Sequence, residues 1–171
     1  MKTFQSKTFE IIKQKARKLK RENGISHVRA LDEIAQQYKF NHWNHLYKTL
    51  KHGLIIALDI KDAADFYDEK KRFVSDEIAY LICQEMLYLD YIESVDDDGI
   101  SFKDKETEAV LKKEFEEYEI DNYRFFRYTV KTLPRTVDEV IKLTNECCFW
   151  QPRYIWLNGE FYNQSGSINI Q

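Results

Sequence analysis

The sequence predicts an α+β protein in which a basic helical module, residues 1–53, precedes an acidic α+β domain, residues 54–171. Apolar residues recur at helical spacing in the first part, and short alternating aromatic segments follow in the second. The charge also changes sign. Through Gly53 there are 12 Lys and Arg against 4 Asp and Glu, a net charge of +8, whereas the rest holds 14 against 25, a net charge of −11. Such an asymmetry is typical of a chain of which one part faces a polyanion, or of two parts that neutralise each other.

The composition indicates a folded protein of the cytoplasm. Of the 171 residues, 43% are hydrophobic and 15% aromatic, which is ample for a packed core, and only five Gly and two Pro interrupt them. No apolar run approaches the roughly 20 residues that a membrane-spanning helix requires. The first ten residues lack the apolar stretch of a secretory signal, and the three Cys lack the spacing of a disulfide framework.

The first predicted helix, residues 9–19, has one apolar face. Phe9, Ile12, Ala16 and Leu19 are three or four positions apart, and most of the Lys and Arg between them fall on the other side. Gly24, after Asn23, is free to adopt the left-handed conformation that ends a helix.

Two shorter helices are expected to complete the module. Ser26 is predicted to cap the second helix and Asn41 the third. The apolar positions of these two helices are Leu31, Ile34, Ala35, Tyr38, Trp43, Leu46 and Leu50. Because helices this short are marginal alone, the three must share a core.

The second and third helices resemble a helix-turn-helix only in part. Ala35 stands where that motif requires a small residue, and Phe40 follows the turn as an apolar plug. Lys39, however, occupies the place of the usual turn glycine, and the apolar positions of the third helix are out of phase with the motif. The sequence therefore predicts a helix-turn-helix-like module.

Residues 24–50 also resemble a short helical module found on glyoxalase-superfamily-related proteins and on plasmid- or phage-borne proteins. The matching positions are Gly24, Ser26, His27, Ala30, Leu31, Ile34, Ala35, Phe40, Trp43 and Leu46. The resemblance covers about a quarter of the chain, departs from the pattern at Lys39, and implies a mobile-element or accessory context. It transfers no catalytic residue, and the absence of any His after residue 52 argues against a glyoxalase-like metal site.

The first half of the α+β domain is expected to be mainly helical. Residues 54–60 form a short buried strand or a helix start, and residues 62–67 form one or two helical turns. Ser75 is predicted to cap a helix that extends to about residue 91, with a core face of Ile78, Ile82, Met86 and Leu89. A turn at residues 96–99 and an acidic helix over residues 104–118 follow.

The second half is expected to supply a small antiparallel sheet. Residues 123–130 alternate as a strand, and Thr136 with Glu139 forms a capping box for a helix that extends to about residue 147. Residues 154–157 and 160–162 are predicted to form a C-terminal β-hairpin on a type I′ turn at Asn158-Gly159.

The positive charge and the amides of the module are the best candidates for a functional site. Lys and Arg neutralise phosphates, and Asn can hydrogen-bond to base edges. A solvated helical face is the competing interpretation. The candidate nucleic-acid-binding residues are Lys13, Lys15, Arg17, Lys18, Lys20, Arg21, Arg29, Lys39, Asn41, Asn44 and Lys48.

Two other functions are compatible with the sequence. The first is a protein-interaction module (an antitoxin, immunity or inhibitor protein) whose acidic domain, with its segment 85–121, binds a basic partner. The second is a metal-independent nuclease that uses Arg124, Arg127, Tyr128 and Lys131. Strand alternation places Arg124 and Tyr128 on the face opposite Arg127 and Lys131, which weakens this hypothesis.

The sequence thus favours a non-catalytic nucleic-acid-binding protein, accessory or regulatory, of a mobile element or defence-related locus. DNA is the favoured partner, and the α+β domain is expected to mediate dimerisation or binding of a protein partner. No cofactor and no membrane partner are expected. No metal site is expected either, because His42 and His45 share a helical face without any nearby Cys.

Overall fold

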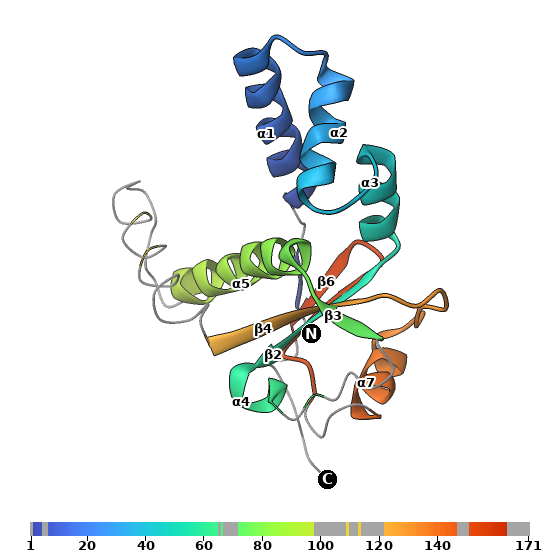
Figure 1. Ribbon diagram of the computed structural model, residues 1–171. Coiled ribbons are helices and arrows are strands. Elements are labelled where there is room, and N and C mark those ends of the chain that lie inside the picture. The colour runs from blue at the N-terminus through green and yellow to red at the C-terminus, as the bar shows by residue number, and fades with distance from the viewer. Residues whose placement is uncertain are drawn as a thin grey trace.

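The computed structural model describes residues 2–4, 7–64, 66, 72–97, 109, 113, 122–146 and 151–163. Figure 1 shows a helical module above a sheet that has helices on both faces. In chain order the elements are β1 (Lys2–Phe4), α1 (Thr8–Asn23), α2 (His27–Gln37), α3 (Trp43–Lys51), β2 (Leu54–Asp59), α4 (Ile60–Ala63), β3 (Phe73–Ser75), α5 (Glu77–Asp97), β4 (Tyr123–Tyr128), α7 (Val137–Asn145), β5 (Tyr154–Leu157) and β6 (Glu160–Asn163). The α+β class predicted from the sequence, with N-terminal helices and a C-terminal hairpin, is confirmed.

The described strands form one six-stranded sheet in the order β1-β6-β5-β2-β4-β3. Every neighbouring pair is antiparallel. β2 therefore lies in the middle, between β5 and β4, and the ambiguous segment after Gly53 is a strand. β1 pairs with β6 and brings the start of the chain into the sheet before α1 begins, which the sequence analysis did not anticipate.

Both faces of β2 are buried, and this explains why its sequence is continuously apolar. Ile55 and Ala57 join the cluster that contains α5 and the module, and Leu54, Ile56 and Leu58 join a second cluster on the other face. The period of two along a strand separates these two sets. α7 covers the second face through Val140, as Figure 1 shows below the sheet.

The helical module shares the first cluster with the sheet. Ile12, Ala16, Ile34, Leu46 and Leu50 are buried in the same contiguous group as the inward residues of the sheet and of α5. Trp156 on β5 donates an indole hydrogen bond of 3.0 Å from Nε1 to the carbonyl oxygen of Leu50 at the end of α3. The module therefore packs on the sheet.

α1 is also held to α5 at its first turn. The Glu85 carboxylate accepts hydrogen bonds from the backbone N–H of Lys7 and from the hydroxyl of Thr8, which is fully buried. A carboxylate at this position satisfies free N–H groups of a helix start and interacts favourably with the helix dipole.

The hairpin of β5 and β6 has the turn that the sequence predicted. Asn158 and Gly159 both have positive φ angles, 52° and 87°, as a type I′ turn requires. The alternation predicted for β4 is also confirmed, because Tyr123 and Phe125 belong to the first cluster while Phe126 and Tyr128 pack against the second.

Several boundaries differ from the prediction. The strand ends at Tyr128, α7 ends at Asn145, and α4 occupies residues 60–63 rather than 62–67. α5 continues through Asp97, so the turn predicted at residues 96–99 is wrong for Asp96 and Asp97, which are helical. The predicted acidic helix 104–118 lies outside the described residues, apart from Ala109 and Lys113.

Candidate nucleic-acid interface

α1 and α2 form a helical hairpin whose turn was predictable. Gly24 ends α1 in the left-handed conformation, with a φ angle of 64°, and its N–H donates to the carbonyl of Lys20. Ser26 caps α2, because its hydroxyl accepts a hydrogen bond of 3.2 Å from the N–H of Arg29. Figure 1 shows this hairpin projecting away from the sheet, with its turn at the far end.

Five cations gather at that far end. Arg17, Lys18, Lys20 and Arg21 occupy the last two turns of α1, and Arg29 lies in the first turn of α2. All five side chains are exposed. The four on α1 lie outside the buried stripe of Ile12 and Ala16, and Arg29 lies outside that of Ala30, Ile34 and Ala35 on α2. We refer to these five residues as the basic tip.

The basic tip is only partly neutralised. Lys18 lies 3.8 Å from the Glu22 carboxylate, and Arg29 lies 2.9 Å from that of Glu33, in both cases one turn along the same helix. Exposed pairs of this kind contribute little, typically ~0.2–1 kcal/mol. A phosphate can therefore compete for these cations. Within the described part of the chain, no side chain of the basic tip pairs with a carboxylate beyond Gly53.

The two remaining predicted cations of α1 make local contacts. Lys13 pairs with Glu10 at 3.2 Å. Lys15 donates a hydrogen bond of 2.9 Å to the hydroxyl of Tyr38, and its Nζ lies 5.6 Å from the centre of that ring. Lys15 thus connects the charged surface of α1 to the end of α2.

The predicted residues in and just before α3 form a separate group at the base of the module. Asn41, Asn44 and Lys48 are exposed. Phe9 in the first turn of α1 contacts Trp43 and Tyr47 of α3, so α3 lies beside the start of α1. At about 1.5 Å per residue, the end of α1 is roughly 18 Å further along its axis. The structure therefore does not bring all eleven predicted residues into one compact patch.

The cap predicted for α3 is wrong. His42, not Asn41, occupies the cap position, and its Nδ1 accepts a hydrogen bond of 3.1 Å from the N–H of His45. The N–H of Asn41 instead donates to His45 Nδ1 at 3.3 Å. A histidine was overlooked because it is not among the usual capping residues, although an unprotonated ring nitrogen is an adequate acceptor.

Lys39 lies in the turn between α2 and α3 with a φ angle of 65°. A glycine usually stands at this position of a helix-turn-helix, and the backbone of Lys39 has the left-handed conformation that favours glycine. Lys39 is exposed, and it lines a cavity together with residues at the start of α5.

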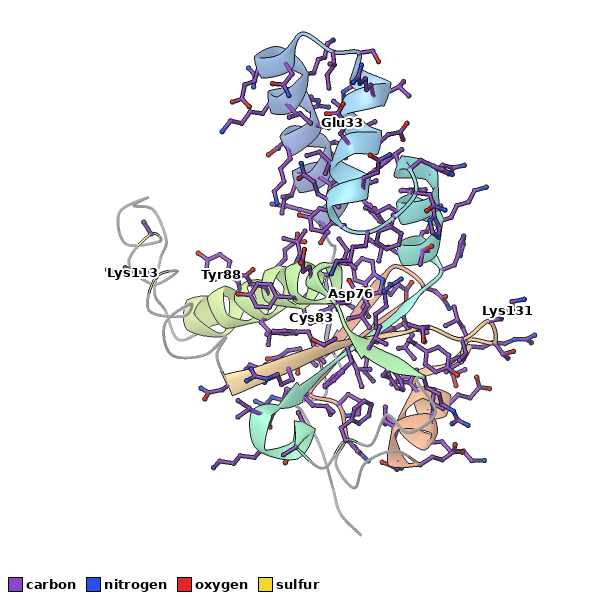
Figure 2. All side chains as sticks on the ribbon, in the orientation of Figure 1. Glu33, Asp76, Cys83, Tyr88, Lys113 and Lys131 are labelled. Carbon is purple, nitrogen blue, oxygen red and sulfur yellow. The ribbon has the colours of Figure 1, made fainter. Side chains whose placement is uncertain are left out.

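This cavity is a feature that the sequence analysis missed. Its volume is about 310 Å³. Its lining comes from the end of α2 and from the start of α5, two segments far apart in the sequence. The lining residues are Tyr38, Lys39, Ser75, Asp76, Glu77 and Tyr80. We refer to it as the α2–α5 cleft. Figure 2 places Asp76 between the module and the start of α5.

Asp76 organises the floor of the cleft. One carboxylate oxygen accepts a hydrogen bond of 2.9 Å from the N–H of Ile78, so Asp76, and not the predicted Ser75, caps α5. The other oxygen lies 2.7 Å from a guanidinium nitrogen of Arg127. The Arg127 guanidinium also lies over the ring of Phe40, 5.1 Å from its centre. Asp76 is therefore held and its charge is compensated.

These contacts separate the groups of the nuclease hypothesis. Arg127 is paired with Asp76, on the face of the sheet that carries the module. Tyr128 packs on the other face, with its ring 5.0 Å from that of Phe73. Arg124 is exposed near the start of β4, and Lys131 is exposed beyond its end. The four side chains do not converge.

Among the described residues, no group of three or more His, Cys, Asp or Glu side chains is arranged to hold a metal ion. None of the described helices combines the length and apolar character needed to cross a bilayer. No protein-family description, curated protein or solved structure matches this chain. The candidate interface therefore depends on the geometry of the chain itself.

Proposed function

We propose that this protein is a non-catalytic nucleic-acid-binding protein that contacts phosphates through the basic tip of its α1–α2 hairpin. The observation that carries the proposal is the placement of five exposed cations at the projecting end of a hairpin. Packing on the sheet uses the apolar stripe and leaves the charged surface open.

The physical basis is the release of counterions from the polyanion. Each cation that neutralises a phosphate releases condensed counterions, so affinity falls with salt by a logarithmic slope of about 0.9 per phosphate on duplex DNA. Within the described residues, Arg17, Lys20 and Arg21 have no carboxylate partner to exchange before they bind phosphate. Lys18 and Arg29 need only leave weak exposed pairs.

DNA remains the favoured partner because α3 follows α2 as in a helix-turn-helix. The chain presents Asn41 just before α3 and Asn44 in its first turn, and the amides of both can hydrogen-bond to base edges. The resemblance of residues 24–50 to a module of plasmid- and phage-borne proteins supports an accessory or regulatory role at a mobile element. The sheet part would then mediate dimerisation or partner binding.

The test is a salt series of binding to duplex DNA and to RNA, measured by fluorescence anisotropy. One variant, the tip variant, changes Arg17, Lys18, Lys20 and Arg21 to Gln. It retains Lys15 and its hydrogen bond to the Tyr38 hydroxyl. The matched control changes Lys61, Lys131, Arg135 and Lys142 to Gln. The control removes the same number of exposed positive charges from the sheet part.

The proposal predicts binding that weakens with salt, a strong loss of affinity in the tip variant, and a salt slope smaller by about one per lost phosphate contact. The control should retain most of the affinity. Absence of binding at low salt, or an equal loss in both variants, would overturn the proposal. A basic protein partner of the acidic part would then be the hypothesis to test.

A further inference from the structure

The α2–α5 cleft has the composition of a site for an aromatic, phosphate-bearing ligand. Tyr38 and Tyr80 supply two aromatic side chains, and 43% of the Tyr80 surface is exposed to solvent. Lys39 is exposed and is the cation among the lining residues. Aromatic rings that line an open cleft beside cations are the usual means by which proteins bind unpaired bases.

The charges around the cleft fit such a ligand. Arg127 compensates the Asp76 carboxylate at 2.7 Å, so Asp76 does not repel a phosphate as a free carboxylate would. Glu77 is exposed at the start of α5, where its carboxylate can accept hydrogen bonds from the amino groups of a base. Lys39 follows α2 directly, and Lys15 of α1 lies with its Nζ 5.6 Å from the centre of the Tyr38 ring.

The conformation of Lys39 is a second, independent observation. A left-handed backbone costs a residue with a side chain about 1–2 kcal/mol, which a glycine would avoid. Strained residues of this kind are found preferentially where a side chain has a function. In this structure Lys39 is one of the residues that line the cleft.

We propose that the α2–α5 cleft binds an unpaired base of a single-stranded nucleic acid, with a ring stacked on Tyr80 and the adjoining phosphate on Lys39. This inference depends on the proposed function, because the same strand would continue along the cations of α1. Lys15 joins the two surfaces through its contact with Tyr38. A cleft of about 310 Å³ is at the small end of ligand sites, and a base inside a duplex cannot enter it.

The experiment compares three fluorescein-labelled probes by anisotropy: a single strand, its duplex, and a single strand of equal length with abasic sugars. The single strand is tested as DNA and as RNA. The abasic strand retains the phosphates and lacks every base, so it isolates the contribution of stacking. Tyr80→Leu removes the ring, Tyr80→Phe retains it, and the tip variant removes the phosphate contacts.

The inference predicts that the protein prefers the base-bearing strand to the abasic strand. Tyr80→Leu should reduce the affinity for the base-bearing strand at least about fivefold, which is the lower end of what one stacked base contributes. The same change should leave the affinity for the abasic strand unaltered. Tyr80→Phe should bind like the unchanged protein. Circular dichroism of each variant establishes that the fold is retained.

The other outcomes separate the two proposals. Equal binding of the base-bearing and abasic strands, lost in the tip variant, would overturn the base-binding cleft and leave the proposed function intact. A preference for the base-bearing strand that Tyr80→Leu retains would also overturn it. Failure of every probe to bind at low salt would overturn both.

Discussion

Lys39 shows how one residue can oppose the local rules of the fold. Its φ angle of 65° closes the turn after α2, where Phe40 must enter the core. Asn158, the other described non-glycine residue with positive φ, has a side chain that tolerates this conformation, whereas a lysine does not. The turn is therefore maintained by the packing around it, at a local cost in free energy.

Replacing Lys39 with Gly should stabilise the protein by about 0.5–1 kcal/mol, because relief of the strain exceeds the extra entropy of the unfolded chain. Lys39→Ala retains the strain and should give no such gain. Urea denaturation of both variants measures the difference. Equal free energies of unfolding for the two variants would show that the backbone strain is negligible.

Cys83 is a buried thiol in the middle of α5, and burial raises its pKa well above the ordinary value. The native protein therefore keeps the thiol proton at a pH at which the unfolded chain, with a thiol pKa of about 8.5, has lost it. The free energy of unfolding should consequently fall as the pH rises above the thiol pKa of the unfolded chain, by up to about 1.4 kcal/mol per pH unit.

A variant with Cys147 and Cys148 changed to Ser isolates this effect. Its remaining thiol should not react with an aromatic disulfide reagent at neutral pH until denaturant is added. A further Cys83→Ala change should remove the additional fall of the free energy of unfolding with pH. Urea denaturation of both variants at several alkaline pH values measures this difference. Rapid labelling of the native protein would contradict the buried position.

At the scale of elements, the start of α3 depends on two side chains. His42 Nδ1 accepts the N–H of His45, and the Asp32 carboxylate of α2 accepts the N–H of Trp43 at 2.9 Å. These contacts satisfy free N–H groups that water would otherwise have to satisfy. The second contact also fixes α3 against α2, and so positions Asn44 and Lys48.

His42→Ala should therefore destabilise the protein by about 1 kcal/mol, the usual cost of losing a helix cap. His42→Ser supplies another acceptor at the same position and should restore most of the loss. Thermal unfolding followed by circular dichroism measures both variants. If Ala and Ser at this position are equally stable, the ring nitrogen does not cap α3.

At the scale of the whole molecule, the module and the sheet share one apolar cluster despite their opposite charges. Trp156 contacts the end of α3, Glu85 the start of α1, and Arg127 the ring of Phe40. Each of these contacts joins the module to a different element of the sheet part. The module should therefore not unfold independently.

Two single-tryptophan variants test this expectation. One retains only Trp43 in the module and the other only Trp156 in the sheet, with the remaining tryptophans changed to Phe. In each variant, the urea transition of tryptophan fluorescence should coincide with that of the far-ultraviolet circular dichroism, as in a two-state transition. An earlier fluorescence transition for Trp43 would show that the module unfolds first.

Features that depend only on neighbouring residues were predictable from the sequence. Three such short-range features are present. They are the helical turn with Gly24 and Ser26, the capping contact of Thr136 with the N–H of Glu139, and the Asn158-Gly159 turn. The alternation of β4 was also predictable, because a period of two follows from strand geometry alone. The exposed cations of α1 followed from its apolar stripe.

The contacts between segments far apart in the sequence were not predictable from it. No local pattern in the sequence indicates the pairing of β1 with β6 or the central place of β2. The same holds for the contact of Trp156 with Leu50, which are 106 positions apart. The α2–α5 cleft is of the same kind, since Lys39 follows α2, Glu77 begins α5, and two helices and two strands lie between them in the sequence. Short-range preferences are fixed by the backbone of a few residues, whereas such contacts depend on how the whole apolar surface is buried at once.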